Sequence, residues 1–229
     1  MKFEGGKTLN LAKYIDHTLL KPTATPAQIE KLCQEARDYQ FATVCVNPWH
    51  VARAAKSLAG SGVGVTTVVG FPLGANKTDI KVKESELALE DGATEIDMVI
   101  NIGAMLAGEY AVVEQDIAAV AKVVANAGVL KVIIETAYLN NEQITTVSKI
   151  TRAAGAQYVK TSTGFAGAGA KVEHVQLMRA AVGHGFGIKA AGGIGDRATA
   201  MAMIDAGATR LGASSGVAIV SGREGADSY

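Results

Sequence analysis

Short apolar runs rich in β-branched residues alternate along the chain with longer stretches whose apolar residues recur at helical spacing. Runs of this length are typical of buried strands, and the stretches between them are typical of amphipathic helices. This alternation indicates a parallel sheet built from repeated β-α units. Eight strands are predicted, over residues 14–19, 42–46, 64–69, 95–100, 130–135, 158–161, 187–190 and 209–212.

Several helix ends can also be placed. Thr25 and Asn47 are each followed by Pro, a pair that offers a side-chain N-cap and a residue suited to the first helical turn. Three Gly-containing triplets, at 91–93, 154–156 and 206–208, each end a helix and enter a strand. Glycine at that position suits a left-handed C-terminal cap. We therefore expect helices between the strands.

Eight parallel strands can close into a barrel or remain an open, doubly wound sheet. A barrel is favoured because polar residues recur at the predicted strand ends, namely Asp16, Asn47, Asp97, Asn101, Glu135, Lys160 and Lys189. A length of 229 residues fits one such unit, and no Pro- or Ser-rich linker divides it. The predicted fold is α/β: a single-domain (β/α)8 TIM barrel over residues 1–229, with a short N-terminal helical segment and a flexible C-terminal tail from about residue 222.

Charge and cysteine content narrow the partners and the compartment. Lys plus Arg and Asp plus Glu both number 22, so no global charge favours nucleic acid or an anionic membrane. Glycines and Pro72 interrupt the uncharged stretch 57–76, which argues against a membrane-spanning helix there. Cys33 and Cys45 cannot build a disulfide framework, and residues 1–6 lack the apolar run of a signal peptide. We expect a cytoplasmic protein without nucleic-acid or membrane partners.

Two lysines stand on neighbouring short strands, Lys160 after Tyr158-Val159 and Lys189 after Gly187-Ile188. A lysine in a buried strand is costly unless it is paired or functional. Like charges on adjacent strands lower the pKa of one lysine, which makes a neutral amine available for Schiff-base formation. The alternative is that each lysine is only a structural ion-pair partner of Asp16, Asp97 or Glu135 at the barrel rim.

Asp97 lies in an otherwise apolar strand, where a carboxylate that faces the barrel could transfer a proton or orient a water between itself and Lys189. The formation of a carbinolamine and the protonation of an enamine both need such a relay. The alternative is a buried ion pair with no catalytic task.

Small residues cluster late in the chain, at 162–164, 191–193 and 212–216. Loops after the last strands of a barrel bind phosphate, because small residues let backbone N–H groups approach the anion. The alternative is that these segments are only tight turns. The four histidines show no spacing typical of a zinc site, so no metal is expected.

Six segments together resemble the deoxyribose-phosphate aldolase family: 14–22, 44–48, 70–74, 95–103, 159–165 and 188–194. The most specific are the two lysine segments, Val159-Lys160-Thr161-Ser162-Thr163-Gly164 and the one that contains Lys189. The resemblance implies a (β/α)8 barrel without metal or cofactor. It also implies the reversible cleavage of 2-deoxy-D-ribose 5-phosphate to D-glyceraldehyde 3-phosphate and acetaldehyde by a homodimer.

By the same resemblance, Lys160 is the Schiff-base lysine, Lys189 perturbs it, and Asp97 belongs to the proton relay. The substrate-binding positions implied are Asp16, Thr163, Gly164, Gly192, Gly193, Gly212, Ser214 and Ser215. The segment 165–171 is smaller and richer in Gly than the usual family pattern. Tyr229 is a candidate proton shuttle, because some members end in a tyrosine-bearing tail, although a terminal Tyr is more often a disordered end.

Two other functions stay open from the residues alone. A phosphosugar isomerase or epimerase on the same barrel would share the phosphate loops and need only acid and base residues. A non-catalytic binder of phosphorylated ligands would need neither lysine to have a depressed pKa. The lysine pair argues against both.

Overall fold

The computed structural model describes residues 9–222, and the predicted tail with Tyr229 lies outside them. The strands are β1 (Ile15–Leu19), β2 (Thr43–Val46), β3 (Gly64–Val69), β4 (Glu95–Val99), β5 (Val129–Ile133), β6 (Tyr158–Lys160), β7 (Gly187–Ala191) and β8 (Arg210–Ala213). All eight pair in parallel, and β8 pairs with β1 to close the barrel. The predicted TIM barrel is confirmed.

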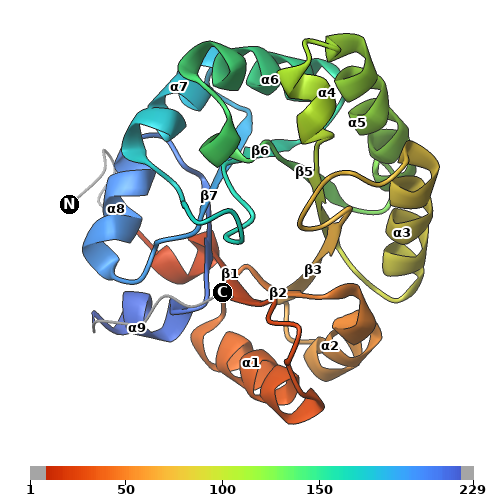
Figure 1. Cartoon of the computed structure of the whole chain (residues 1–229). Helices are drawn as coiled ribbons and strands as arrows, with labels where there is room; N and C mark the ends of the chain where they lie inside the picture. Colours follow the sequence, from red (N-terminus) through yellow and green to blue (C-terminus); the bar gives the residue numbers. More distant parts are fainter. Residues whose placement is uncertain (1–8, 223–229) are drawn as a thin grey trace.

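Helices surround this barrel as an outer ring (Figure 1). The α-helices are α1 (Pro26–Tyr39), α2 (Val51–Leu58), α3 (Thr78–Glu90), α4 (Ile102–Leu106), α5 (Tyr110–Val124), α6 (Asn141–Ala153), α7 (Val172–Val182), α8 (Arg197–Asp205) and α9 (Gly216–Ser221). Three 3-10 helices are η1 (Leu11–Tyr14), η2 (Pro48–His50) and η3 (Thr136–Tyr138). The predicted N-terminal helical segment is η1. Among the described residues, no helix has the length and apolarity needed to cross a bilayer.

The predicted helix ends are confirmed in part. Thr25 caps α1 through a capping box with Gln28, with Pro26 in the first turn. Asn47 was expected to do the same for the next helix, but its side chain makes no capping bond. Its amide instead donates to the Leu20 carbonyl at 3.0 Å. This contact ties the end of β2 to the loop after β1.

The main core lies between the barrel and the helices, because one face of each strand packs outward. Val44, Ile96, Val132, Ile188 and Leu211 belong to this layer and are fully buried. The other face of each strand fills the barrel. There the side chains are mostly polar or charged, so the barrel interior differs from an ordinary apolar core.

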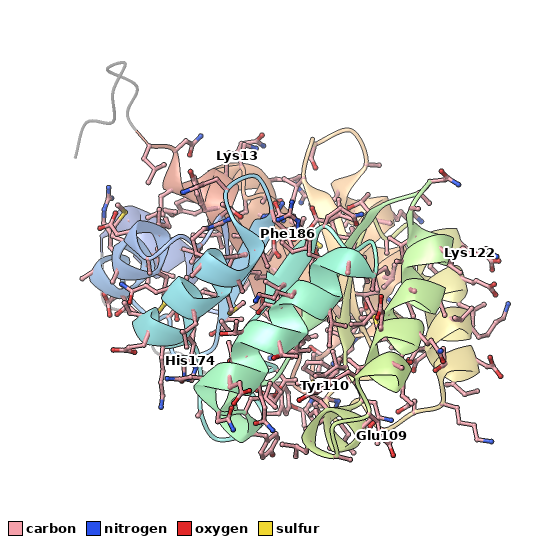
Figure 2. The ribbon with its side chains drawn as sticks, turned by 90° about the horizontal axis from the view of Figure 1, so that it is seen from above. Lys13, Glu109, Tyr110, Lys122, His174 and Phe186 are labelled. Carbon is pink, nitrogen blue, oxygen red and sulfur yellow. The ribbon has the colours of Figure 1, made fainter. Side chains whose placement is uncertain are left out.

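The two ends of the barrel differ in what they carry. In Figure 2, Lys13 and Phe186, which precede strands, lie at one end of the molecule. Glu109, Tyr110 and His174, which lie near helix starts after strands, are at the opposite end. The second end is therefore the carboxyl end of the strands, where barrel enzymes place their sites. We call this end the mouth.

Candidate active site

The interior of the barrel holds one continuous ionic network. Three carboxylates meet four cations there, and six different strands supply them: Asp16 (β1), Glu95 and Asp97 (β4), Lys131 (β5), Lys160 (β6), Lys189 (β7) and Arg210 (β8). Side chains from opposite strands can meet only inside the barrel. The sequence prediction that Lys160, Lys189 and Asp97 converge is thus matched by the geometry.

Asp97 is the centre of this network. Its Oδ2 accepts hydrogen bonds from Lys160 Nζ at 2.8 Å and from Lys189 Nζ at 2.7 Å. Its Oδ1 accepts one from Lys131 Nζ at 2.7 Å. Asp97 and Lys189 were considered as partners through an oriented water, but here they touch directly.

Two further carboxylates lie around this centre. Asp16 Oδ2 contacts Lys189 Nζ at 2.5 Å, and Asp16 Oδ1 accepts from Arg210 at 2.7 Å. Arg210 also donates to Glu95 at 2.8 Å, and Glu95 contacts Lys131 Nζ at 2.6 Å. Asp16 therefore belongs to the network and forms an ion pair with Lys189. This is one of the pairings named above in the structural alternative for that lysine.

The pKa values of the three lysines shift in different directions because their partners differ. Burial lowers the pKa of Lys160, and the Lys189 charge lowers it further, while Asp97 opposes both. Burial also acts on Lys189, but Asp16 and Asp97 outweigh it and hold the pKa of Lys189 well above its ordinary range. The pKa of Lys131 is likewise raised, by Asp97, Glu95 and Asp16 against burial. Lys160 is therefore the member of this trio suited to be a neutral amine.

Charge counting leads to the same conclusion. The ion pairs of this network join four cations to three carboxylates, and the one excess positive charge within the network is unfavourable because the network is buried. Burial disfavours the charged form of Asp97 as well, but Lys131, Lys160 and Lys189 outweigh it and hold the pKa of Asp97 well below its ordinary value. The loss of one proton from Lys160 balances the network at three against three.

Sequence reasoning missed Lys131, Glu95 and Arg210. A signal was present, because side chains two apart on a strand share a face, so an inward Asp97 implies an inward Glu95. Lys131 also interrupts an apolar strand in the manner of Lys160. Their mutual contact, however, follows only from closure of the barrel.

The small-residue segments gather on one side of the mouth, in the loops after β6, β7 and β8. Gly164, Gly192 and Gly193 all have a left-handed backbone, with φ of 88°, 85° and 76°. Gly212 lies on β8, and Ser214 and Ser215 follow that strand. Adjacent strands therefore bring the predicted phosphate-binding residues to neighbouring loops.

The unusual Gly-rich segment 165–171 has a packing role here. Ala170 N donates to the carbonyls of both Ala191 and Gly192, at 3.1 and 3.0 Å. A Cβ on Gly169 would lie 2.2 Å from the Gly192 carbonyl oxygen, so a larger residue cannot fit without movement. Glycine at 169 is what lets the loops after β6 and β7 lie against each other.

Apolar side chains line the interior next to the lysines. Leu20, Cys45 and Val68 form a small cluster with Phe71 packed on it. Burial raises the pKa of the Cys45 thiol. Cys45 is therefore packed as a small buried apolar residue.

The histidines are not gathered at the mouth. His17 lies within 2.7 Å of Glu35 through Nε2, a contact that links β1 to α1. Within residues 9–222, no group of three or more His, Cys, Asp or Glu side chains is arranged to hold a metal ion.

Comparison with known proteins places this geometry in a family. The model of the DeoC/LacD family aldolases matches residues 10–223. Deoxyribose-phosphate aldolase of Brevibacillus brevis is 55% identical over 214 residues, which cover 93% of this chain and 96% of that protein. The enzyme of the same name from a Geobacillus strain is 54% identical over 220 residues, covering 96% and 99%.

A solved structure agrees with the fold. Deoxyribose phosphate aldolase of Aeropyrum pernix, described as a tetramer, superposes with a TM-score of 0.86 at 33% identity, over 92% of this chain and 89% of that one. Nearly the whole barrel, including every residue of the ionic network, falls within the matched range of the family model. The chain belongs to the DeoC/LacD family of aldolases.

Proposed function

We propose that the chain reversibly cleaves 2-deoxy-D-ribose 5-phosphate to D-glyceraldehyde 3-phosphate and acetaldehyde, through a Schiff base on Lys160. The observation that carries this proposal is the state of Lys160. It is the buried lysine of the network whose pKa is lowered, beside a carboxylate whose ionised form and a lysine whose protonated form are favoured in the resting site. A neutral, shielded amine is what attack on an aldehyde carbon requires.

In the proposed reaction, Lys160 Nζ attacks C1 of the open-chain sugar, and the carbinolamine loses water to give an iminium. The C3 hydroxyl then loses its proton as the C2–C3 bond breaks, and the electron pair of that bond moves into the enamine. D-glyceraldehyde 3-phosphate leaves, C2 of the enamine takes a proton, and water releases acetaldehyde and the amine. Asp97, already within hydrogen-bond reach of Lys160 and Lys189, is proposed to carry the protons.

The phosphate is assigned to the loops after β6, β7 and β8. Gly164, Gly192 and Gly193 have left-handed backbones in neighbouring loops, and Ser214 and Ser215 add hydroxyls at the next strand end. Backbone N–H groups that small residues leave accessible are suitable donors to a phosphate. Thr163, on the same loop as Gly164, is proposed to contact the sugar part.

Trapping tests the reaction class and the residue at once. Incubation with acetaldehyde and borohydride, followed by peptide mass mapping, is expected to label Lys160. The exposed Lys149 is the internal reference, because it lies on α6, outside the barrel interior. A label that is absent from Lys160, or is no greater there than on Lys149, would refute the proposal.

The rival functions predict other outcomes. An isomerase or epimerase keeps its turnover in Lys160→Arg, whereas the aldolase loses it. A binder shows phosphosugar affinity without any trapped adduct. The homodimer and the cytoplasmic location remain predictions, which light scattering and cell fractionation would test.

A further inference from the structure

Glu135 has an unusual backbone conformation at the mouth. It lies two residues after the end of β5 and has φ 51° and ψ 71°, in the left-handed region. Gln40, the other described residue of this kind that is not glycine, ends a helix, where such a conformation is ordinary. Strained positions of this sort tend to cluster at functional sites. The sequence placed Glu135 at the end of a strand and missed this turn.

The turn aims the Glu135 carboxylate at the loop after β6. Oε2 accepts hydrogen bonds from the Thr163 backbone N–H at 3.2 Å and from the Thr163 hydroxyl. Oε1 is also buried, yet it has no hydrogen-bond partner in the described part of the chain. The whole residue is only 1% exposed. A buried carboxylate oxygen without a donor is costly, so its retention calls for an explanation.

These bonds also determine what Thr163 can do. A hydroxyl has one hydrogen to donate and two lone pairs to accept with. The hydrogen of Thr163 Oγ1 goes to Glu135, and one lone pair accepts the Phe165 N–H at 3.0 Å. What is left is one lone pair. Thr163 and Glu135 Oε1 together therefore offer acceptors and no donor.

Both residues line a cavity of about 230 Å³ at the mouth. Its other walls are mostly apolar and include Leu73, Ile102, Tyr138 and Phe165. The ring of Phe165 meets that of Phe71 edge to face, with centroids 5.3 Å apart. The volume is below the range of about 300–1,000 Å³ typical of whole small-molecule sites. The cavity therefore suits part of a ligand, a short carbon segment that carries a hydrogen-bond donor.

We propose that Glu135 is a specificity-determining residue, which accepts a hydrogen bond from the 2-hydroxyl of the phosphorylated acceptor aldehyde at Oε1 and fixes Thr163 as a second acceptor. This inference rests on the proposed function. In the proposed function the substrate runs from the Lys160 imine to the phosphate loops, and Glu135 is hydrogen-bonded to Thr163, which lies between Lys160 and Gly164 in the chain. Burial raises the pKa of Glu135, so a hydroxyl that donates to Oε1 would stabilise the ionised form.

The test compares two acceptors in the condensation with acetaldehyde: D-glyceraldehyde 3-phosphate, and 3-phosphonooxypropanal, which lacks the 2-hydroxyl. In Glu135→Gln, kcat/KM for the hydroxylated acceptor is expected to fall about 10- to 100-fold, because a charge-assisted hydrogen bond is lost. For the other acceptor the change should stay within about threefold. The matched control is Glu142→Gln, on the exposed start of α6, which should change neither value.

An equal fall for both acceptors, or no fall, would overturn the proposal. Thr163→Val is the second variant: it should reduce the preference for the hydroxylated acceptor in the same way, and the double variant should lose little more. If Glu135→Gln does not fold, the preference in Thr163→Val alone decides. Acetaldehyde trapping at Lys160, carried out on the wild type and on each variant, distinguishes a failure of the proposed function from a failure of the Glu135 proposal. If the wild type is not labelled, the proposed function is contradicted, whereas the acceptor preference of the variants tests only the role of Glu135.

Discussion

At the scale of single residues, the protonation state of Lys160 depends on how many cations compete for Asp97. Lys131 takes Oδ1 of that carboxylate, and Lys189 shares Oδ2 with Lys160. Each competitor reduces the capacity of Asp97 to stabilise a proton on Lys160. We therefore expect Lys131, which shares Asp97 with Lys160, to help lower the pKa of the proposed nucleophile.

Lys131→Met removes one competitor and keeps the length of the side chain. The pKa of Lys160 should then rise, because three cations would face three carboxylates with Lys160 still protonated. Since the neutral amine is the proposed reactive form, the acidic limb of kcat/KM should shift to higher pH by about one unit. Activity at neutral pH should fall about tenfold. A pH profile of 2-deoxyribose 5-phosphate cleavage measures both.

Lys189→Leu provides the comparison within the network. Lys189 pairs with Asp16 as well as Asp97, so its loss should shift the limb in the same direction and reduce turnover more sharply. Lys149→Met, on the exposed face of α6, is the control and should leave the profile unchanged. An unshifted acidic limb in folded Lys131→Met would mean that Lys131 has a structural role only.

At the scale of elements, the mouth is divided between two groups of loops. Those after β6, β7 and β8 carry the glycines, and those after β3, β4, β5 and β6 form the apolar cavity around Glu135. The loop after β6 belongs to both groups. Its position against the next loop depends on the close approach of Gly169 to Gly192.

Gly169→Ala should separate these two loops, because the added Cβ would overlap the Gly192 carbonyl oxygen. We expect KM for 2-deoxyribose 5-phosphate to rise about tenfold, with kcat reduced less than about threefold. For 2-deoxyribose without the phosphate, KM should change little. Gly103→Ala, in α4, meets nothing closer than 3.5 Å and serves as the control. An equal rise of KM for both sugars would count against a phosphate role for these loops.

Much of the element scale followed from sequence, for identifiable reasons. The outward face of each strand packs against helices, so all eight strands carried an apolar pattern that located them. The turn at Glu135 did not follow, because nothing in Ile134-Glu135-Thr136 marks a left-handed residue. The contact between 169 and 192 also did not follow, since it depends on the spacing of two loops distant in sequence.

At the scale of the whole molecule, the network couples stability to pH. Burial opposes ionisation of Asp16, but Lys189, Lys131 and Arg210 outweigh it and hold the pKa of Asp16 far below its ordinary value. The stabilisation is present above the unfolded pKa of about 3.9 and is lost as the pH falls toward the folded pKa. The acid limit of the fold is thus partly set inside the barrel.

Asp16→Asn should lower the free energy of unfolding by about 3 kcal/mol at pH 7, because Lys189 and Arg210 lose a partner. The difference from wild type should shrink as the pH falls below about 4. There Asp16 of the unfolded wild type binds a proton before Asp16 of the folded protein does, so the wild type loses stability. Denaturant unfolding at pH 7 and pH 3 measures both values. Asp205→Asn, an exposed position at the end of α8, should show no such pattern. A difference that stays constant with pH would rule out this linkage.

The excess positive charge in the barrel interior has a further consequence for the proposed chemistry. An environment that lowers the pKa of Lys160 would also resist the iminium cation that is proposed to form there later. That cation is relieved when it withdraws the electron pair of the neighbouring carbon–carbon bond and becomes a neutral enamine. The same imbalance would thus produce a nucleophile in the resting enzyme and an electron sink once the substrate is attached.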